Sequence, residues 1–241
     1  MEEWLTQPHT SKYNSASVSE SISNRYPWLR RYPPRNRFLT NNEYLFLKRI
    51  FDLVIIFLSS PGWLFVMSVC GLLIKLGEPK GKVMFTQERT GIGGHRFAMY
   101  KFRTMVVNAE ELKIEFSHLN ELQWPDFKIT NDPRITKIGS FLRKTSLDEL
   151  PQIINVIRGE MSLVGPRPTS FSADTYALWH TERLDVIPGL TGLWQLLGRG
   201  ETEFDERLRM DITYIERRCM RLDMHILLRT VFAVLKQKGA H

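Results

Sequence analysis

Apolar residues form one long run in this sequence, at positions 50–76, and no other stretch is comparably apolar. A straight helix of that length would reach about 40 Å, enough to cross the roughly 30 Å hydrocarbon core of a bilayer. Ser60 and Pro61 lie near the middle of the run, and a proline inside a helix breaks or kinks it. The run therefore predicts a membrane helix with a hinge at these two residues.

Basic residues flank both ends of the run, with Lys48 and Arg49 before it and Lys75 near its end. This distribution gives a crossing helix no clear orientation under the positive-inside rule. A helix that enters the bilayer, turns at the hinge and returns places both basic ends in the cytoplasm. We therefore predict a re-entrant helix, with an ordinary single span carrying a proline kink as the alternative. Asp52 would lie near the interface and is expected to pair with Arg49 or Lys48.

The segments after the run predict a small α+β domain that is mainly helical. Residues 83–103 alternate apolar and polar positions on both sides of a glycine-rich connection, a pattern typical of a β-hairpin. Residues 108–124, 204–215 and 224–235 repeat apolar positions every three to four residues, as amphipathic helices do. The last of these is flanked by cations, which suits packing on the domain or lying in the membrane interface.

Charge and cysteine content narrow the class of protein. The 241 residues carry a net charge of +7, which favours an anionic partner such as nucleic acid, an acidic membrane surface or a phosphorylated substrate. The two cysteines form no metal-ligand spacing and predict no disulfide framework. Residues 1–42 are rich in Ser, Asn, Pro and Arg and predict a mostly disordered arm. A membrane segment at 43–77 and a cytosolic domain at 78–241 would follow it.

Two adjacent carboxylates, Asp148 and Glu149, stand where a helix is expected to begin. An apolar repeat continues over 150–157, and Gly159 follows it at a position suited to a helix end. Free N–H groups and the helix dipole favour negative charge in a first turn, so Asp148 is expected to stay ionised, able to attack phosphorus or hold a metal. The alternative is structural capping, either by Ser146 in a capping box with Glu149 or by Asp148 as N-cap.

We call Asp148 and Glu149 the dyad. Cations occur at several positions around it, and one of these cations, Arg143, lies shortly before the dyad in the sequence. Alternation along the second hairpin strand places Lys101 and Arg103 on one face, which makes either a solvated basic edge or an anion clamp. Arg167 lies between two prolines, which fix its backbone, although such a segment alone is typical of an exposed rigid turn. A guanidinium offers a forked donor set that matches phosphate oxygens.

Two further positions are candidates for a site. Asp211 falls on the apolar stripe of the 204–215 helix, where an acid needs a cationic partner, a metal or a pocket. Trp194 lies in a glycine-dense stretch at 186–200, and it suits a binding loop, the core or an interface equally well.

Taken in order, these segments resemble the bacterial sugar transferase family, the monotopic polyprenyl-phosphate phosphoglycosyl transferases. The resemblance covers residues 46–238, and its segments are 48–52, 60–61, 101–105, 132–134, 143–152, 159–168, 188–195 and 211–214. None of these segments is specific alone, but their ordered co-occurrence is very hard to obtain by chance. The resemblance implies a monotopic protein with a re-entrant helix hinged at Ser60 and Pro61, and amphipathic interfacial helices around a small catalytic domain.

The resemblance also implies an activity at the cytoplasmic face of the bacterial inner membrane. Such an enzyme transfers a sugar 1-phosphate from a UDP-sugar to undecaprenyl phosphate and releases UMP, in the first membrane step of exopolysaccharide or lipopolysaccharide synthesis. Mg²⁺ would be the cofactor, Asp148 the nucleophile and metal ligand, and Glu149 an aid to proton transfer or metal positioning. The residues expected to bind substrate phosphates are Lys101, Arg103, Arg143 and Arg167. Asp211 and Trp194 remain substrate or structural candidates.

Other functions compete with this one. A basic membrane-surface adaptor of a glycan-assembly complex would bind anionic lipid without chemistry. A nucleic-acid binder is permitted by the charge but disfavoured by the apolar hairpin and the lack of a known motif. The expected partners are a UDP-sugar, undecaprenyl phosphate and the lipid bilayer, with a homo-oligomer and downstream glycosyltransferases as further candidates.

Overall fold

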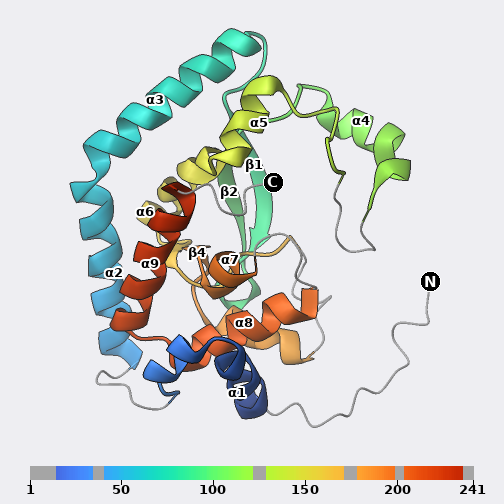
Figure 1. Ribbon diagram of the computed structural model, residues 1–241. Helices are drawn as coiled ribbons and strands as arrows, with labels where there is room; N and C mark the ends of the chain where they lie inside the picture. The colour runs from blue at the N-terminus through green and yellow to red at the C-terminus, as the bar shows by residue number, and fades with distance from the viewer. Residues whose placement is uncertain (1–14, 35–40, 122–128, 171–177, 199–203, 236–241) are drawn as a thin grey trace.

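The computed structural model describes residues 15–34, 41–121, 129–170, 178–198 and 204–235, and its fold is α+β and mainly helical, as predicted (Figure 1). The α-helices are α1 (Ser15–Arg25), α2 (Asn41–Leu58), α3 (Ser60–Gly77), α4 (Ala109–Glu115), α5 (Lys137–Lys144), α6 (Ile153–Arg158), α7 (Leu193–Leu197), α8 (Phe204–Arg217) and α9 (Met220–Leu235). The strands are β1 (Met84–Thr90), β2 (Arg96–Phe102), β3 (Ser162–Val164) and β4 (Gly189–Thr191). Short 3₁₀-helices are η1 (Pro27–Arg31), η2 (Ile92–Gly94), η3 (Phe116–Leu119), η4 (Leu147–Gln152) and η6 (Leu178–Asp185).

The apolar run forms two helices, α2 and α3, which meet at Ser59. The Ser59 hydroxyl donates to the Ile55 carbonyl (2.6 Å). The Trp63 indole donates to the Ile56 carbonyl (2.9 Å). Side chains thus bond backbone carbonyls at the break, which makes it tolerable in an apolar medium. Pro61 lies in the first turn of α3, where its missing N–H removes no helical hydrogen bond, so the chain breaks directly before the predicted hinge.

Helices α2 and α3 run along the left and upper edge of Figure 1, and many of their apolar side chains are exposed. The most exposed of these side chains are Phe46, Phe57, Leu58, Phe65, Leu72 and Leu76. By length and composition α3 could cross a membrane, and only 11% of its span is buried within the protein. An exposed apolar surface of this extent is typical of contact with lipid. The re-entrant path stays a prediction.

The middle of α2 is anchored to later parts of the chain, and the expected pairing of Asp52 with Arg49 or Lys48 is not among the ion pairs of the described residues. Asp52 Oδ2 accepts a hydrogen bond from the Ser162 hydroxyl (2.6 Å) at the start of β3. Lys48 Nζ instead binds Asp223 Oδ2 of α9 (2.9 Å). Arg49 donates to the last carbonyls of α6. Tertiary packing therefore supplies partners that lie closer than the neighbours along the helix.

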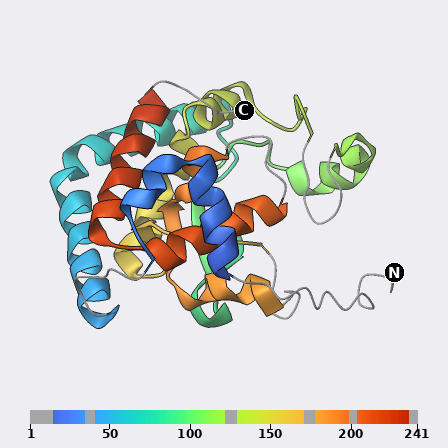
Figure 2. The same ribbon diagram turned by 60° about the horizontal axis from the view of Figure 1, so that its bottom comes forward.

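Residues 15–34, expected within a mostly disordered arm, form α1 and η1, so that prediction is wrong for them. Figure 2 brings α1 forward, where it lies against α8. Leu29 of η1 is completely buried, and Arg217 of α8 donates to the Tyr32 carbonyl (2.8 Å). The rest of the predicted arm up to residue 40 lies outside the described residues.

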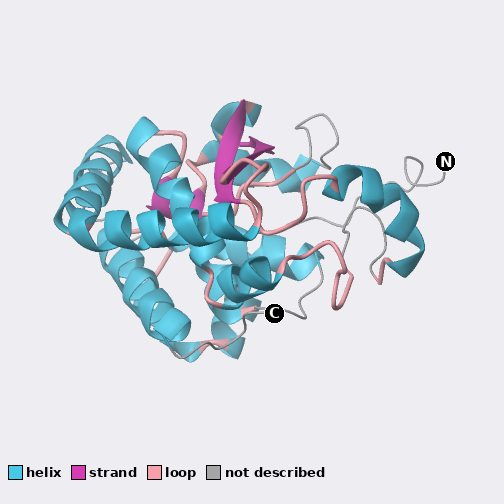
Figure 3. Cartoon of the chain, turned by 90° about the horizontal axis from the view of Figure 1, so that it is seen from above, coloured by secondary structure: helices cyan, strands magenta, loops and turns pink. Residues whose placement is uncertain are grey.

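Strands β1 and β2 form the predicted antiparallel hairpin, connected through η2. A second small sheet pairs β3 with β4 in parallel, and Figure 3 shows helices surrounding both sheets. The hairpin is held by two apolar clusters, because Met99 packs into one and Phe102 into the other. Asn155 of α6 fixes it further, since its side chain bonds the Tyr100 N–H (3.0 Å) and the Ala98 carbonyl (2.8 Å).

The element that carries the dyad packs against α3. Cys70 and Ile74 of α3 form a buried cluster with Leu142 of α5, and Leu147 and Leu150 of η4 pack against it. This packing therefore fixes the position of the two acids between these leucines relative to α3. If α3 lies in the bilayer, this packing sets the distance between the dyad and the lipid surface.

Candidate active site

Asp148 and Glu149 lie in the first turn of η4, a 3₁₀-helix that precedes α6. Ser146 before them has a left-handed backbone (φ 57°), and its side chain makes no capping hydrogen bond. Because α6 begins only at Ile153, Asp148 is not its N-cap. Both capping alternatives are therefore wrong, and neither carboxylate is used to cap a helix. Gly159 ends α6 in the left-handed conformation (φ 84°), as predicted.

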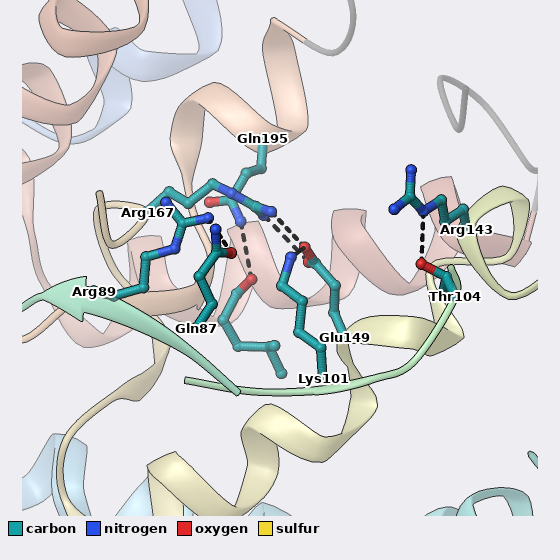
Figure 4. A network of polar contacts seen from close by, with 9 residues as sticks. Gln87, Arg89, Lys101, Thr104, Arg143, Glu149, Arg167 and Gln195 are labelled. Atoms are coloured by element: carbon teal, nitrogen blue, oxygen red, sulfur yellow. Dashed lines mark hydrogen bonds and ion pairs between the residues drawn. The ribbon is translucent and has the colours of Figure 1, made fainter. Parts of the chain in front are cut away.

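Glu149 is held by two cations, as Figure 4 shows. Arg167 forms a forked ion pair with both carboxylate oxygens, and its Nη1 lies 3.2 Å from Oε2. Lys101 Nζ lies 3.2 Å from Oε1. Burial acts to raise the pKa of Glu149, but the charges of Arg167 and Lys101 outweigh it and lower the pKa. Glu149 is therefore ionised at neutral pH.

Asp148 is half-buried, and within the described ranges no hydrogen bond reaches its carboxylate. Burial and then the charge of Glu149 raise the pKa of Asp148, whereas the charges of Lys101 and Arg143 act to lower it. Burial and the neighbouring anion therefore outweigh any effect of the helix start on this pKa, and the ionised state of Asp148 stays a prediction. A carboxylate with a raised pKa is a stronger base, so it is also a better nucleophile once it is ionised.

Arg143 approaches the dyad from α5. Its Nε donates to Thr104 Oγ1 (2.9 Å), which fixes the plane of the guanidinium. Its two Nη groups form no hydrogen bond with the described part of the chain. In Figure 4 Arg143 and Thr104 stand apart from the group around Arg167. Arg143 is therefore oriented at one nitrogen and open at the other two, as an anion-binding guanidinium should be.

The structure does not bring Arg103 to the dyad. Arg103 follows the end of β2, and its guanidinium lies 3.4 Å from Glu78 Oε2 and donates to the Glu78 carbonyl (3.3 Å). Lys101 turns to Glu149 instead. The two cations predicted to share one strand face thus bind different acids.

A buried ion pair contacts the backbone of Arg167. Arg183 Nη2 lies 2.7 Å from Asp211 Oδ2 and donates to the Arg167 carbonyl (2.6 Å). Burial raises the pKa of Asp211 to about 7, although Arg183 opposes that rise. Asp211 therefore fits the structural alternative, a buried ion pair that holds the Arg167 backbone. Trp194 is half-buried in α7 beneath the Arg207 guanidinium, 5.5 Å from its ring centre, and contacts the larger cluster.

Sequence reasoning missed several polar residues around the dyad. Gln87 and Arg89 of β1 lie beside Arg167 in Figure 4, and Arg89 Nη2 donates to Gln87 Oε1 (2.6 Å). Their signal was the alternation of the first hairpin strand, which places both on one face. Arg183 and Thr104 carried no such signal, because only tertiary packing brings them to the site.

Asp148 is the carboxylate available to a divalent cation, because Arg167 and Lys101 engage Glu149. No group of three or more His, Cys, Asp or Glu side chains gathers as a metal site in the described residues. Mg²⁺ usually binds through one or two carboxylates and completes its shell with waters and substrate phosphates. The site therefore fits an ion shared with a phosphorylated substrate, and not an ion held by the protein alone.

Comparison with known proteins gives a consistent result. The family model described as bacterial sugar transferase matches residues 43–237. An undecaprenyl-phosphate galactose phosphotransferase from Salmonella typhimurium is 40% identical over 84% of this chain and 43% of its own length. A UDP-glucose:undecaprenyl-phosphate glucose-1-phosphate transferase from Xanthomonas campestris pv. campestris is 38% identical over 83% of this chain and 41% of its own length. The chain thus spans less than half of these two relatives.

A shorter relative matches over most of its length. The exopolysaccharide production protein ExoY of Rhizobium meliloti is 38% identical over 80% of this chain and 88% of its own length. The aligned part therefore corresponds to nearly all of that protein and to a portion of the two longer ones.

Proposed function

Because this chain belongs to the bacterial sugar transferase family, we propose that it transfers a sugar 1-phosphate from a UDP-sugar to undecaprenyl phosphate and releases UMP. The relatives named for transfers to undecaprenyl phosphate support the reaction class. The observation that carries the proposal is the state of the dyad, in which Glu149 is engaged by two cations and Asp148 is left open. We infer that Asp148 is the nucleophile.

The first step is an in-line displacement at the β-phosphorus of the donor. An oxygen of Asp148 attacks phosphorus, the bond between phosphorus and the bridging oxygen breaks, and UMP leaves with both electrons of that bond. The product is a phosphosugar ester on Asp148. In the second step an oxygen of undecaprenyl phosphate attacks the same phosphorus and displaces the Asp148 carboxylate. Splitting one transfer into two displacements lets one site serve a soluble and a lipid-bound substrate in turn.

The charges around Asp148 match polyanionic substrates. In the described site Lys101, Arg143 and Arg167 stand near two carboxylates, and Arg89 adds a fourth cation through its effect on Lys101. The positive excess offsets repulsion between an anionic nucleophile and a diphosphate, in a partly buried place where such charges act strongly. Asp148 would help to hold Mg²⁺, which when bound would supply Lewis-acid stabilisation of the leaving phosphate.

Glu149 acts in this proposal as a fixed anion. It holds the Lys101 ammonium and the Arg167 guanidinium beside Asp148, and its charge contributes to the raised pKa of Asp148. Proton transfer by Glu149 is disfavoured, because the two cations lower its pKa.

The membrane arrangement completes the proposal. Helix α9 runs beside α2 in Figures 1 and 2 and exposes its own apolar residues, Met224, Leu228, Val231 and Phe232. We infer that α2 and α3 enter the cytoplasmic leaflet of the inner membrane and turn at Ser60 and Pro61, and that α9 lies at its surface. The dyad would then face the headgroup level, where a polyprenyl phosphate presents its phosphate.

The test is UMP release by the purified full chain in detergent with Mg²⁺, undecaprenyl phosphate and a panel of UDP-sugars. The proposal expects release with at least one sugar and its loss in Asp148→Asn. Asp185→Asn, which removes an exposed carboxylate outside the site, is the matched control and should keep full activity. If the protein binds vesicles but releases UMP from no donor, the basic membrane-surface adaptor replaces the enzyme. A homo-oligomer and downstream glycosyltransferases stay predictions.

A further inference from the structure

One face of the β1–β2 hairpin carries polar side chains beyond the dyad. In the register of the hairpin, Arg89 lies opposite Phe97, and Phe85 lies opposite Lys101. Directly opposed residues of an antiparallel pair share a face, so Gln87 and Arg89 project to the same face as Lys101. Four residues of strand separate the levels of Arg89 and Lys101, which at ~3.4 Å per residue is about 14 Å. We call Lys101, Gln87 and Arg89 the hairpin track.

The two ends of the hairpin track have different surroundings. At the dyad end, Phe102 packs with Cys70 and Ile74 of the membrane helix α3. At the other end, the η2 turn contacts η6, and the Thr90 N–H donates to the Thr169 carbonyl (2.8 Å). A small pocket there is lined partly by Thr90 and Thr169. The track therefore leads away from α3.

The groups on the track suit a nucleoside. Arg89 donates to Gln87 Oε1, and no hydrogen bond from the described residues engages the Gln87 amide nitrogen. A guanidinium plane stacks on a pyrimidine ring, and a primary amide supplies a donor and an acceptor for a base or a ribose. Burial lowers the pKa of Lys101, and the charge of Arg89 adds to that effect. The charge at the far end of the track therefore acts on the lysine beside the dyad.

The opposite side of the dyad has a different character. Arg143 lies apart from Gln87 and Arg89 in Figure 4, and its Nη groups are open within the described structure. It is carried by α5, whose Leu142 packs directly on Cys70 and Ile74 of α3. Arg143 is therefore a cation on an element in contact with the membrane helix, placed for a phosphate that arrives along α3.

We propose that the donor nucleotide lies along the hairpin track, with its uridine at Gln87 and Arg89, and that Arg143 receives the phosphate of the lipid acceptor. This assignment rests on the function proposed above. The soluble donor and the lipid acceptor then reach Asp148 from opposite directions, so UMP can leave along the track while the acceptor enters beside α3.

Separate measurement of the two substrates tests the assignment. In a two-step transfer, kcat/KM for each substrate reports its own half-reaction, and UMP release without acceptor isolates the first. Arg89→Gln should lower kcat/KM for the UDP-sugar at least about tenfold and weaken UMP inhibition by a similar factor, as expected for a lost contact to a charged group. The value for undecaprenyl phosphate should stay within about twofold. Gln87→Leu, a smaller perturbation, should change the same constants in the same direction.

Arg143→Gln should show the opposite preference, with a loss in kcat/KM for undecaprenyl phosphate about tenfold larger than the loss for the UDP-sugar. Arg96→Gln removes one charge from the other face of the same hairpin and is the matched control. Equal losses for both substrates in Arg89→Gln and in Arg143→Gln would overturn the assignment. If Asp148→Asn still releases UMP, the proposed function fails first, and the two failures are thereby distinguished.

Discussion

Gly139 lies where α5 passes the backbone at Thr104, and Gly139→Ala tests how the Arg143 side of the site is built. A Cβ at position 139 would stand 1.9 Å from the Thr104 carbonyl oxygen and 2.6 Å from its carbonyl carbon. An ordinary contact between heavy atoms is ~3.5 Å, so α5 and Thr104 must separate by roughly 1.5 Å. Because backbone atoms form the obstacle, no rotation of a side chain relieves the clash.

The expected destabilisation follows from two contributions. Overpacking of this kind costs about 1–3 kcal/mol. The same carbonyl accepts a hydrogen bond from the Thr136 N–H (3.0 Å), and its loss adds about 1 kcal/mol. The total of about 2–4 kcal/mol corresponds to a fall in Tm of roughly 5–15 °C for a domain of this size. UMP release should fall as well, because Thr104 Oγ1 orients Arg143.

Thermal unfolding of the detergent-solubilised protein measures the effect, and Gly62→Ala is its control. Gly62 lies in α3 with nothing within 4 Å of the added Cβ, and alanine is favoured over glycine in a helix by about 1 kcal/mol. This variant should match or exceed the wild-type Tm. A Gly139→Ala protein with the Tm of the Gly62→Ala protein would refute the close approach of α5 to Thr104 and the orientation of Arg143 derived from it.

Three further predictions concern the arm, the dyad and the support of Arg167. Leu29→Ala should lower the free energy of unfolding by about 2–5 kcal/mol, while the exposed Leu119→Ala should be near neutral; equal effects would mean that the arm is not packed. Glu149→Gln removes an anion that, after burial, raises the pKa of Asp148, so the acid limb of the pH–rate profile should move to lower pH. Asp211 has a pKa raised from 3.8 to about 7, so the stability that this one group contributes is fully present below about pH 4 and is lost as the group ionises up to pH 7. Asp211→Asn removes that slope, so denaturant titrations at pH 4 and pH 8 should show its stability relative to wild type rising by about 4 kcal/mol; a constant difference would contradict the raised pKa.

The periodic features of the sequence predicted most of the fold. The alternation over 83–103 gave the hairpin, and the broken apolar run gave two helices that meet at Ser59. The arm was misjudged because its stability depends on few residues, Ile22 and Leu29, which polar neighbours separate along the chain. The average composition of the segment hides these two apolar residues. The segment folds because both of them pack against α8 and α9.

The sequence predicted which residue types form the candidate site. It predicted less well which side chains contact one another. Proline neighbours and spacing singled out Arg167, and the structure places it on Glu149. Nothing local separates Lys101 from Arg103, since alternation predicts both on one strand face; in the structure Arg103 lies just past β2 and binds Glu78. Arg183 reaches the Arg167 carbonyl only because α8 and η6 pack together. Residues that reach the site only through tertiary packing leave no periodic pattern in the sequence.

The central claim is that Asp148 carries the phosphosugar between donor and acceptor. It is tested most directly by incubating the protein with Mg²⁺ and a UDP-sugar labelled with ³²P at the β-phosphate, without lipid acceptor, and mapping the label by peptide mass spectrometry. We expect one sugar phosphate on the peptide that contains Asp148, its removal on addition of undecaprenyl phosphate, and no label on Asp148→Asn. UMP release without labelled protein, or label on another residue, would contradict the account.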